Sequence, residues 1–432
     1  MVWLMLGLGA VAISSATAGA LLAMSLTSTP LLQSQLSPED ADVFNEGESI
    51  SSDTNFRLPQ LTRPVNILVL GIKVLTSDLD DLPESSRNQG YHALVNSFDG
   101  LSDTMLLLRF DPEHKQLSVL SLPRDTRTWV EGVGETKLNE ANVHGGPALA
   151  ATTTTELLGG VKIDRYVRIN VQGVEKLIDA LGGVTVYVPK DMQYQDDSQH
   201  LYIDLKQGEQ HLDGNQALQF LRFRYDQNGD IGRIQRQQMM MRALQEQALS
   251  PATLTRLPQI LSVIQSNIDT NLSVEELVAL VGFAAQTSRS NVEMLMLPGR
   301  FSTPDQYSLS YWLPSRSRIE TMMGRYFGLD VDSSAEESAR SVRIAIQDSS
   351  DRPDAVDQLV NQLQAAGYSN VSVDRPWSEP LATTRVIAQQ GDTHSADAVQ
   401  EAIGLGEVRI ESTGSLDSDV TIQLGTDWQP ER

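Results

Sequence analysis

The sequence contains no cysteine, and this absence restricts the chemistry open to the protein. A chain without cysteine has no disulfide, no thiolate zinc site and no cysteine nucleophile, and an oxidising compartment does it no harm. The chain also lacks a P-loop, an HExxH sequence and a GxSxG sequence, and no order of Ser, His and Asp nominates a catalytic triad. Any enzymatic activity must therefore rest on other residues.

Basic residues are scarce as well. The 432 residues include 33 Lys and Arg against 56 Asp and Glu, which gives a formal net charge of −23. Because affinity for DNA or RNA comes mainly from neutralising phosphates with Lys and Arg, this balance argues against nonspecific nucleic-acid binding. We expect no nucleic-acid partner, and any phosphate ligand must be met by a local group of cations. The length predicts two or three domains.

The N-terminal region has no charged residue from Trp3 to Met24. This run is rich in Leu, Ala, Gly and Met and is long enough to cross about 30 Å of hydrocarbon. Residues 1–26 are therefore predicted to form a single transmembrane anchor. A cleaved signal peptide is the alternative, with Ala-Thr-Ala at 16–18 resembling a cleavage region. No Lys or Arg precedes the run, so the positive-inside rule does not orient it.

The segment that follows, residues 27–63, is rich in Ser, Thr, Pro, Asp and Glu and has few large apolar side chains. A segment of this composition buries too little surface to fold, so it is predicted to be a disordered acidic linker.

Residues 64–300 are predicted to form an α/β domain, with a mixed central sheet flanked by helices. Short apolar runs predict strands at 65–71, 104–110, 117–122 and 184–188. The second and third of these are joined by a short turn and should form a hairpin. Helical spacing predicts helices at 145–158, 171–181, 214–220 and 231–248. The last two flank Leu221–Tyr225, which is predicted to be a strand.

A smaller domain is predicted at 340–430, after a connector at 301–339. Its elements alternate as β-α-β-β-α-β, which is typical of a small αβ sandwich. The strands are predicted at 341–347, 370–374, 384–388 and 419–424, and the helices at 353–366 and 395–403.

Arginines are concentrated in one part of this acidic chain, around the helix at 231–248. On a strand, Arg222 and Arg224 would point to the same face, and on the helix Arg233 and Gln237 would share a face. The helix N-terminus also favours an anion through its free N–H groups and its dipole. These groups could converge on one phosphate, which Arg binds in a bidentate manner. The alternative is that the arginines pair with surface carboxylates.

Charged residues also lie at the ends of two predicted strands. Asp103 directly precedes one strand, and Arg124 and Asp125 directly follow another. Strand ends are where a sheet presents ligand-binding groups. Each aspartate could equally cap a turn.

Taken together, the motifs of this chain resemble the LytR-CpsA-Psr family. They are Asn66–Gly71, Ser102–Met105, Leu122–Thr126, Lys137–Ala141, Asp179–Val184, Gly208–Gly214, Ala217–Arg224 and Gly229–Gln238. The resemblance covers about residues 64 to 250. The tail, which includes Asp419–Trp428, resembles the LytR-type C-terminal domain that is often attached to this family.

The resemblance implies a single-pass protein of the cell membrane, with its N-terminus inside and its catalytic domain on the extracytoplasmic (periplasmic) side. Such enzymes transfer a glycopolymer from a polyprenyl pyrophosphate carrier to peptidoglycan and form a phosphodiester bond. The implied partners are the lipid-linked glycan, peptidoglycan and the membrane. Two alternatives stay open: a hydrolase of the polyprenyl pyrophosphate, and a noncatalytic envelope protein that binds polyprenyl phosphate or peptidoglycan.

The resemblance also implies roles for individual residues. The pyrophosphate would be bound by Arg124, Lys137, Arg222, Arg224, Arg233, Arg236 and Gln237. Asp103 would hold Mg²⁺ (or Mn²⁺), the implied cofactor. Asp230 would either orient Arg233 or act as base on the attacking hydroxyl of peptidoglycan.

One position departs from the family pattern. The first strand of the family usually ends in Gly-x-Asp, and that aspartate is a second metal ligand, whereas this chain has Gly71, Ile72 and Lys73. A charged lysine does not bind Mg²⁺. We therefore expect either that Asp78 or Asp80 takes over as ligand, or that the Lys73 ammonium replaces part of the metal's charge.

The lipid also needs a binding site. Apolar residues of the helix at 231–248 exceed what one core face requires, and methionine is adaptable enough to line a channel for a polyprenyl chain. The alternative is ordinary core packing. The residues concerned are Ile231, Ile234, Met239, Met240, Met241 and Leu244.

Overall fold

The computed structural model describes most of the chain from residue 36 onward. The described residues are 36–44, 49–52, 59–73, 98–196, 201–223, 229–248, 250–288, 291–329, 342–350, 352, 354–411, 413–415 and 418–428. The predicted anchor at 1–26 lies outside these ranges. Within them, no helix combines the length and the apolar character that crossing a membrane requires.

The centre of the molecule is a mixed sheet, six-stranded in the described part of the chain, in the order β11-β6-β1-β2-β3-β12. β1 is antiparallel to β2 and parallel to β6, and β3 is antiparallel to β2 and parallel to β12. The predicted hairpin is thus confirmed. The strands are β1 Val65–Lys73, β2 Leu101–Asp111, β3 Gln116–Leu122, β6 Arg165–Asn170, β11 Ile268–Thr270 and β12 Val292–Met296.

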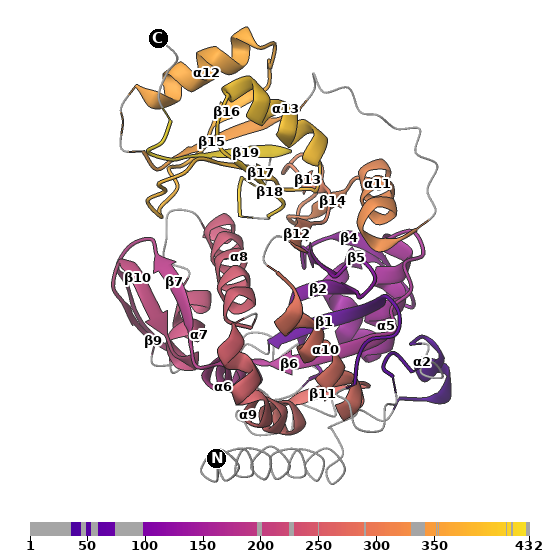
Figure 1. Cartoon of the computed structure of the whole chain (residues 1–432). Coiled ribbons are helices and arrows are strands. Elements are labelled where there is room, and N and C mark those ends of the chain that lie inside the picture. The colour runs from indigo at the N-terminus through magenta and orange to yellow at the C-terminus, as the bar shows by residue number, and fades with distance from the viewer. Residues whose placement is uncertain are drawn as a thin grey trace, which may run out of the picture.

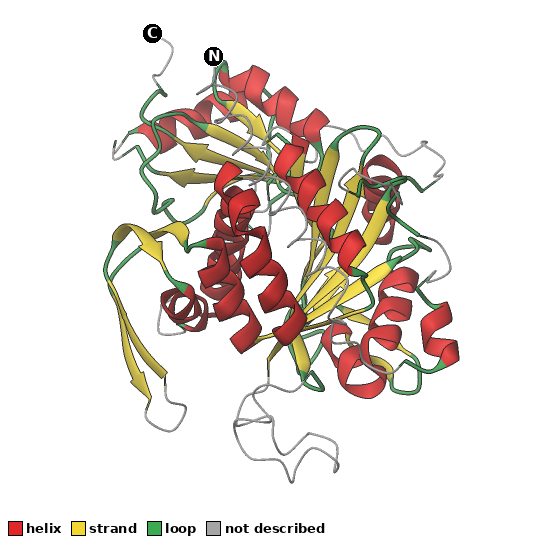
Figure 2. Cartoon of the chain, turned by 60° about the horizontal axis from the view of Figure 1, so that its bottom comes forward, coloured by secondary structure: helices red, strands yellow, loops and turns green. Residues whose placement is uncertain are grey.

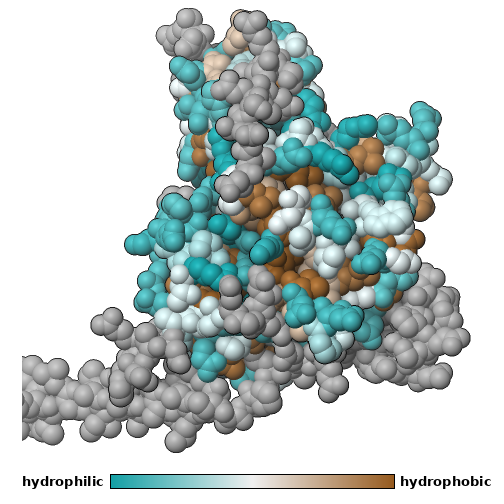
Figure 3. Space-filling view, turned by 90° about the vertical axis from the view of Figure 1, so that its right-hand side faces the viewer, coloured by the Kyte–Doolittle hydropathy of each residue, from teal (hydrophilic) through white to brown (hydrophobic). Residues whose placement is uncertain are grey.

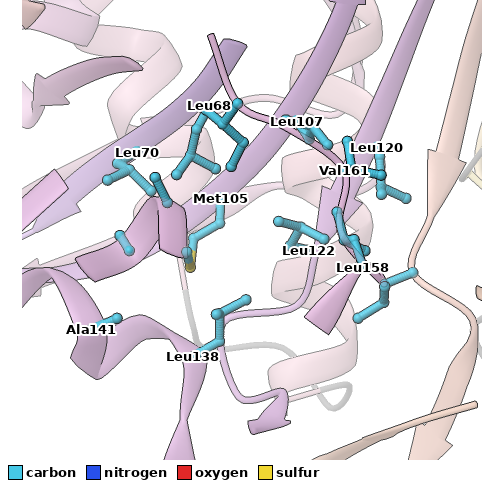
Figure 4. Close-up of a cluster of buried hydrophobic side chains, with 14 of the residues drawn as sticks. Leu68, Leu70, Met105, Leu107, Leu120, Leu122, Leu138, Ala141, Leu158 and Val161 are labelled. Carbon is cyan, nitrogen blue, oxygen red and sulfur yellow. The ribbon is translucent and has the colours of Figure 1, made fainter. Parts of the chain in front are cut away.

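Both faces of this sheet are buried, which explains the continuous apolar runs Ile67–Leu70 in β1 and Met105–Leu108 in β2. Along β1, Leu68 and Leu70 enter one core and Ile67 enters the other. Figure 4 shows the first core, where leucines of β1, β2 and β3 face Leu138 and Ala141. Helices cover each face, as Figures 1 and 2 show. They are α5 Ala141–Leu157 and α11 Arg316–Phe327 against the first core, and α6 Val171–Leu181, α9 Pro251–Asn267 and α10 Val274–Gln286 against the second.

The described parts of the segment 27–63 are folded, so its prediction as a disordered linker is wrong there. Residues 38–42 form helix α2 (Pro38–Asp42), which a Ser37–Asp40 capping box starts. Phe44 is fully buried in the first core, with its ring centroid 5.0 Å from that of Tyr166. Ile50 is fully buried in the second. Two large apolar side chains are enough to anchor a segment whose overall composition is polar.

A side layer carries the arginine-rich region. It contains the hairpin β8 Met192–Asp196 and β9 Leu201–Leu205, the pair β7 Val184–Val188 and β10 Gly208–Leu212, and the helices α7 Gly214–Arg222 and α8 Gly229–Ala248. α6 ends at Gly182, whose positive φ of 90° is the left-handed conformation that glycine adopts without strain. The layer has its own core around Phe220 and Met240.

The prediction of a strand at Leu221–Tyr225 is wrong for its first residues. α7 starts at a capping box made by Asp213 and Gln216 and continues through Arg222, and Phe223 is the extended residue that ends it. The alternation of five residues resembled a strand, but it is too short to override a well-capped helix. Residues 224–228 lie outside the described part.

The predicted connector at 301–339 is also wrong as far as residue 329. The hairpin of β13 (Gly299–Phe301) and β14 (Trp312–Pro314) occupies its first part. α11 follows and buries Ile319, Met323 and Phe327 in the first core. This segment therefore belongs to the main domain. A second hairpin, β4 Arg127–Val130 and β5 Gly134–Lys137, lies nearby and leads into the short helix η2 Leu138–Glu140.

The C-terminal domain has a five-stranded sheet in the order β16-β15-β19-β17-β18, with two helices packed on one face. The predicted order of elements is present, and the short strand β18 was not predicted. The elements are β15 Ile344–Asp348, α12 Ala355–Ala365, β16 Val371–Val373, β17 Arg385–Ala388, α13 Thr393–Ile403, β18 Glu407–Arg409 and β19 Val420–Leu424. Figure 1 shows this domain above the main sheet.

The two domains are joined by specific contacts. The backbone N–H of Met294 in β12 donates to the carbonyl of Ile410, at 3.0 Å. The hydroxyl of Tyr326 in α11 donates to the carbonyl of Gly391, at 2.6 Å. A tyrosine hydroxyl is already protonated at neutral pH, and burial raises the pKa of Tyr326 further, to about 12. β12 and α11 therefore bind the C-terminal domain to the main domain. Figure 3 views the molecule from the α11 side and shows hydrophobic residues near the middle of that face.

Candidate active site

A pocket opens where β2, β3 and β12 meet α8 and the β13–β14 hairpin. It leaves about 60 Å³ for the centres of water-sized molecules and is partly open to solvent. Most of its lining is apolar, as in typical small-molecule sites. Representative apolar lining residues are Met105, Leu106, Val119, Met241, Met294 and Trp312. Its polar residues include Asp103, Arg124, Asp125, Gln237 and Gln238.

Asp103 is positioned by an irregularity in the sheet. The pairing between β1 and β2 shifts so that Gly71 faces Thr104 while Ile72 faces Ser102, and Asp103 falls between the two pairs. Such a bulge bends the strand and changes the direction of the extra side chain. Here the Oδ1 atom of Asp103 accepts a hydrogen bond from Nη1 of Arg124, at 2.5 Å. The bulge thus places a carboxylate at the mouth of the pocket.

Arg124 is the second member of a row of alternating charges. Its Nε atom lies 3.4 Å from Oδ2 of Asp125, and Nζ of Lys137 lies 2.8 Å from Oδ1 of Asp125. The side chains of Arg124 and Lys137 are each 24% exposed, so solvent reaches both cations. The row carries two positive and two negative charges. An anionic ligand at the pocket would therefore compete with the carboxylates for the guanidinium and the ammonium.

Trp312 attaches a distant part of the chain to this row. Its backbone N–H donates to the carbonyl of Asp125 at 2.9 Å, and its indole N–H donates to the carbonyl of Leu297 at 3.2 Å. The ring is fully buried and packs edge-on against Phe301, with centroids 5.1 Å apart. The β13–β14 hairpin therefore holds the Arg124–Asp125 turn and closes one side of the pocket.

One face of α8 lines the pocket, and another packs in the core of the side layer. Gln237, Gln238 and Met241 line the pocket. Met240 is 1% exposed in the core of the side layer. Arg236 is 3% exposed, lies over the ring of Phe223 and donates to the Phe223 carbonyl. The helix thus joins the side layer to the pocket.

Comparison with known families decides where this chain belongs. The LytR_cpsA_psr family matches residues 33–326, which is more than half of the chain. The chain belongs to the LytR-CpsA-Psr family. The LytR cell envelope-related transcriptional attenuator family matches residues 341–428, which cover the C-terminal domain.

Individual LytR-CpsA-Psr relatives agree. The polyisoprenyl-teichoic acid–peptidoglycan teichoic acid transferase TagU of Oceanobacillus iheyensis is 34% identical over 271 residues, 61% of this chain and 75% of the relative. The transferase TagV of Bacillus subtilis is 30% identical over 228 residues, 51% of this chain and 58% of the relative, so less than two thirds of TagV is covered. The crystal structure of protein gbs0355 from Streptococcus agalactiae matches with a TM-score of 0.50 at 26% identity, covering 61% of this chain and 86% of that one.

The structure brings together some of the residues that the family resemblance implies. Asp103, Arg124 and Gln237 line the pocket. Lys137 forms an ion pair with Asp125, which also lines the pocket. Arg222 is half-buried in the last turn of α7 and is not among the lining residues. Arg236 is not among them either, and it is buried against Phe223, so its contact with pyrophosphate stays a prediction.

For some of the other implied residues the structure describes only the backbone, and others lie outside the described ranges. Asp230 and Arg233 lie in the first turns of α8 as predicted, but only their backbone is described. Arg224, Asp78 and Asp80 lie outside the described residues. Lys73, the last residue of β1, pairs with Leu101 of β2, and Leu101 lies two residues before Asp103. In the LytR-CpsA-Psr pattern, the position of Lys73 would hold the metal-binding aspartate.

The fit of a metal ion can be tested on the carboxylates at the pocket. Within the described ranges, no group of three or more His, Cys, Asp or Glu side chains could hold a metal. Asp103 and Asp125 flank Arg124 at the pocket mouth. Mg²⁺ is usually bound by one or two protein carboxylates together with substrate phosphates and water. Asp103 is one carboxylate of this kind, and its Oδ1 atom also accepts a hydrogen bond from Arg124.

Several lining residues were not predicted from the sequence. Met294 and Met296 stand in the four-residue apolar run Met294–Leu297, and this run is a strand signal that sequence reasoning could have used. Trp312 lies in a strand of three residues, which leaves no periodic pattern. Of the apolar α8 residues proposed for the lipid channel, Met241 lines the pocket whereas Met240 packs in the core of the side layer.

Proposed function

We propose that the protein transfers a glycopolymer from a polyprenyl pyrophosphate carrier to peptidoglycan and forms a phosphodiester bond. The observation that carries this proposal is an apolar pocket with Asp103, Arg124 and Asp125 at its mouth and Lys137 beside them. An apolar cavity suits a polyprenyl chain, and cations at its mouth suit the pyrophosphate. The printed names of the TagU and TagV relatives, which describe transferases acting on polyisoprenyl-teichoic acid and peptidoglycan, support it.

The proposed reaction is a phosphoryl transfer. A hydroxyl oxygen of peptidoglycan forms a bond to the phosphorus that carries the glycan, and the bond from that phosphorus to the bridging oxygen breaks. Polyprenyl phosphate leaves with the bridging oxygen, and the hydroxyl proton goes to a base. In such reactions the protein acts mainly by positioning the groups and by stabilising charge.

The residues of the pocket have different roles in this reaction. The Arg124 guanidinium binds phosphate oxygens, and Lys137 stabilises the charge from the far side of Asp125. Gln237 offers an amide donor from α8. Asp230 and Arg233 occupy the first turns of α8, where the free N–H groups and the helix dipole favour an anion. Asp230 either orients Arg233 or accepts the proton of the attacking hydroxyl.

Mg²⁺ (or Mn²⁺) is the proposed cofactor, with Asp103 as its protein ligand. When bound, the ion would neutralise charge on the phosphate oxygens. The second ligand is proposed to be Asp78 or Asp80, because Lys73 stands at the position of the aspartate in the family pattern. Mg²⁺ affinity, measured by calorimetry, should fall in Asp78→Ala or in Asp80→Ala, and unchanged affinity in both would sink this assignment.

We also propose that the protein is anchored in the cell membrane by residues 1–26, with the catalytic domain on the extracytoplasmic side. This position would bring the pocket to a lipid-linked donor and to peptidoglycan. The uncharged run from Trp3 to Met24 supports the anchor.

An incubation of the protein with a polyprenyl pyrophosphate-linked glycan and Mg²⁺, with and without peptidoglycan, tests the proposal. Transfer of the glycan to peptidoglycan supports it. Release of glycan phosphate to water alone, with or without peptidoglycan, identifies a hydrolase, and binding without turnover identifies a noncatalytic envelope protein. Full turnover by an Arg233→Ala variant would show that the site has been wrongly assigned.

A further inference from the structure

An aromatic surface adjoins the charged row of the pocket. On the β4–β5 hairpin, Arg127 pairs with Lys137 and Trp129 pairs with Glu135, so these four side chains share one face. The opposite face is inward, because Val130 is fully buried in the first core. The face that carries Trp129 therefore points outward.

The loop between β13 and β14 adds two tyrosines to this face. The ring of Tyr307 lies 4.9 Å from the guanidinium of Arg127, and the ring of Tyr311 lies 5.7 Å from the ammonium of Lys137. The two rings are edge to face, with centroids 5.3 Å apart. Trp129, Tyr307 and Tyr311 thus form what we call the aromatic ledge.

The ledge is held in place and is open to solvent. The ends of the loop are tied by hydrogen bonds from the Ser302 N–H to the Tyr311 carbonyl, at 2.8 Å, and from the Tyr311 N–H to the Ser302 hydroxyl, at 2.9 Å. Trp129 is 60% exposed, and Leu309 at the loop tip is 58% exposed. Single exposed apolar residues are common on protein surfaces. Here, however, Trp129 shares a strand face with Arg127, the Arg127 guanidinium contacts Tyr307, and Tyr307 packs against Tyr311 on a braced surface.

The ledge is continuous with the proposed reaction centre. Lys137 contacts Tyr311 on one side and Asp125 on the other, and Asp125 contacts Arg124 at the pocket mouth. A molecule bound on the ledge would therefore lie next to the pyrophosphate. This is the place that the attacking hydroxyl must reach.

We infer that the aromatic ledge binds the uncharged sugar rings of a peptidoglycan glycan strand, the acceptor of the reaction. The apolar C–H faces of pyranose rings pack well on exposed aromatic rings. A glycan strand carries fewer negative charges than a phosphate-rich polymer, which suits a surface where residues 127–137 and 302–311 hold two basic against three acidic side chains. An open ledge also accepts the middle of a long strand, which a closed pocket does not. This inference rests on the proposed function, because it assigns the acceptor of that reaction.

Binding of a peptide-free peptidoglycan glycan strand, measured by calorimetry, tests the inference. Trp129→Ala should weaken binding about tenfold, which is the order expected for one aromatic contact. Trp129→Phe should restore part of the loss. The matched control is Tyr202→Ala, which removes another exposed aromatic side chain, 53% exposed, from β9 in the side layer. Because Trp129 is largely exposed, thermal unfolding of the variant should match that of the unaltered protein.

Several outcomes would overturn the inference. They are equal binding by Trp129→Ala and the unaltered protein, an equal loss in Tyr202→Ala, no binding of the strand at all, and a loss that affects only the lipid-linked donor. In the transfer assay, Trp129→Ala should raise KM for peptidoglycan about tenfold and leave KM for the donor unchanged. Strand binding that depends on Trp129 without any transfer would contradict the proposed function but not the ledge. Transfer with unchanged KM values in Trp129→Ala would contradict the ledge but not the function.

Discussion

At the scale of single residues, the candidate site depends on how a few charged side chains are oriented. Asp103, Arg124 and Asp125 were predicted as strand-end groups, and the structure places all three at one pocket. The bulge that directs Asp103 is not visible in the sequence, because it is a shift of register between two strands. The burial of Arg236 against Phe223 is not visible in the sequence for a related reason. Helical spacing does not show which of two neighbouring cores a residue faces.

Arg124 is the residue on which the pocket mouth depends most. Replacing it by Ala removes a charge-assisted contact to the pyrophosphate and should lower kcat/KM for transfer by roughly 30- to 1,000-fold. Arg124→Lys should recover only part of this, since an ammonium lacks the planar fork of a guanidinium. The control is Arg375→Ala, at an exposed position of the C-terminal domain. Transfer by Arg124→Ala at the rate of the control would refute the role of Arg124.

Asp419 predicts a dependence of stability on pH. Burial alone would raise its pKa, but hydrogen bonds from Arg343 and the charges of Arg343 and Arg318 outweigh burial and hold the pKa below its usual value. A depressed carboxyl pKa stabilises the fold above the pKa of the unfolded chain, about 4. This stabilisation is lost as the pH falls below that value. Urea unfolding at a series of pH values should show a smaller acid loss in Asp419→Asn, and an unchanged profile would contradict the assignment.

At the scale of elements, the central strands were predictable and the short or isolated contributions were not. β1 and β2 are buried on both faces, and each contains a continuous apolar run, Ile67–Leu70 and Met105–Leu108. β14 has three residues, and the segment around Phe44 has one large buried ring within a polar stretch. The average composition of a segment does not reveal a single large residue that is buried. Their effect appears only once tertiary packing is known.

Phe44 tests whether the segment before the sheet is part of the fold. Phe44→Ala should lower the free energy of unfolding by about 3 to 5 kcal/mol, because it leaves a cavity against Tyr166. Urea unfolding measures this change. Val133→Ala, at a residue 40% exposed in the β4–β5 turn, should change it by about 0.5 kcal/mol or less. If the two variants are equally stable, the segment is not packed as described.

A buried ion pair ties α10 to the central sheet. Glu276 accepts hydrogen bonds from Nε and Nη2 of Arg165, at 3.2 and 2.7 Å, and also caps α10 by accepting from the Ser273 N–H. Glu276→Gln keeps the cap but removes the carboxylate facing Arg165, which should cost about 3 to 5 kcal/mol. Glu407→Ala breaks an exposed pair with Arg409 and should cost about 1 kcal/mol or less. Thermal unfolding of the two variants should separate them, and equal losses would contradict the burial argument.

At the scale of the whole molecule, one strand serves two purposes. β12 lines the pocket through Met294 and Met296 and also holds the C-terminal domain through the Met294–Ile410 hydrogen bond. The acidic bulk of the protein is compatible with the two cations at the pocket mouth, because the proposed ligand carries one local pyrophosphate. The docking of the C-terminal domain was not predictable, since its contacts come from segments that the sequence shows as loops.

Gly391 tests this docking. A Cβ atom there would come within 2.6 Å of the Tyr326 ring and 2.8 Å of Leu295, whereas one at Gly367 meets nothing within 4 Å. Both glycines have positive φ, so Gly367→Ala controls for backbone strain. Only Gly391→Ala should separate the domains and speed hydrogen exchange at the Met294 N–H. Equal exchange at this amide in both variants would contradict the described interface.

One measurement tests the central claim most directly. The purified protein is incubated with a polyprenyl pyrophosphate donor whose glycan is labelled, together with Mg²⁺ and peptidoglycan, and the label in the insoluble peptidoglycan is counted. We predict that the label becomes attached through a phosphodiester bond, and that Arg124→Ala lowers the initial rate of attachment by roughly 30- to 1,000-fold. Label that stays on the lipid, or appears only as soluble glycan phosphate, would contradict the claim.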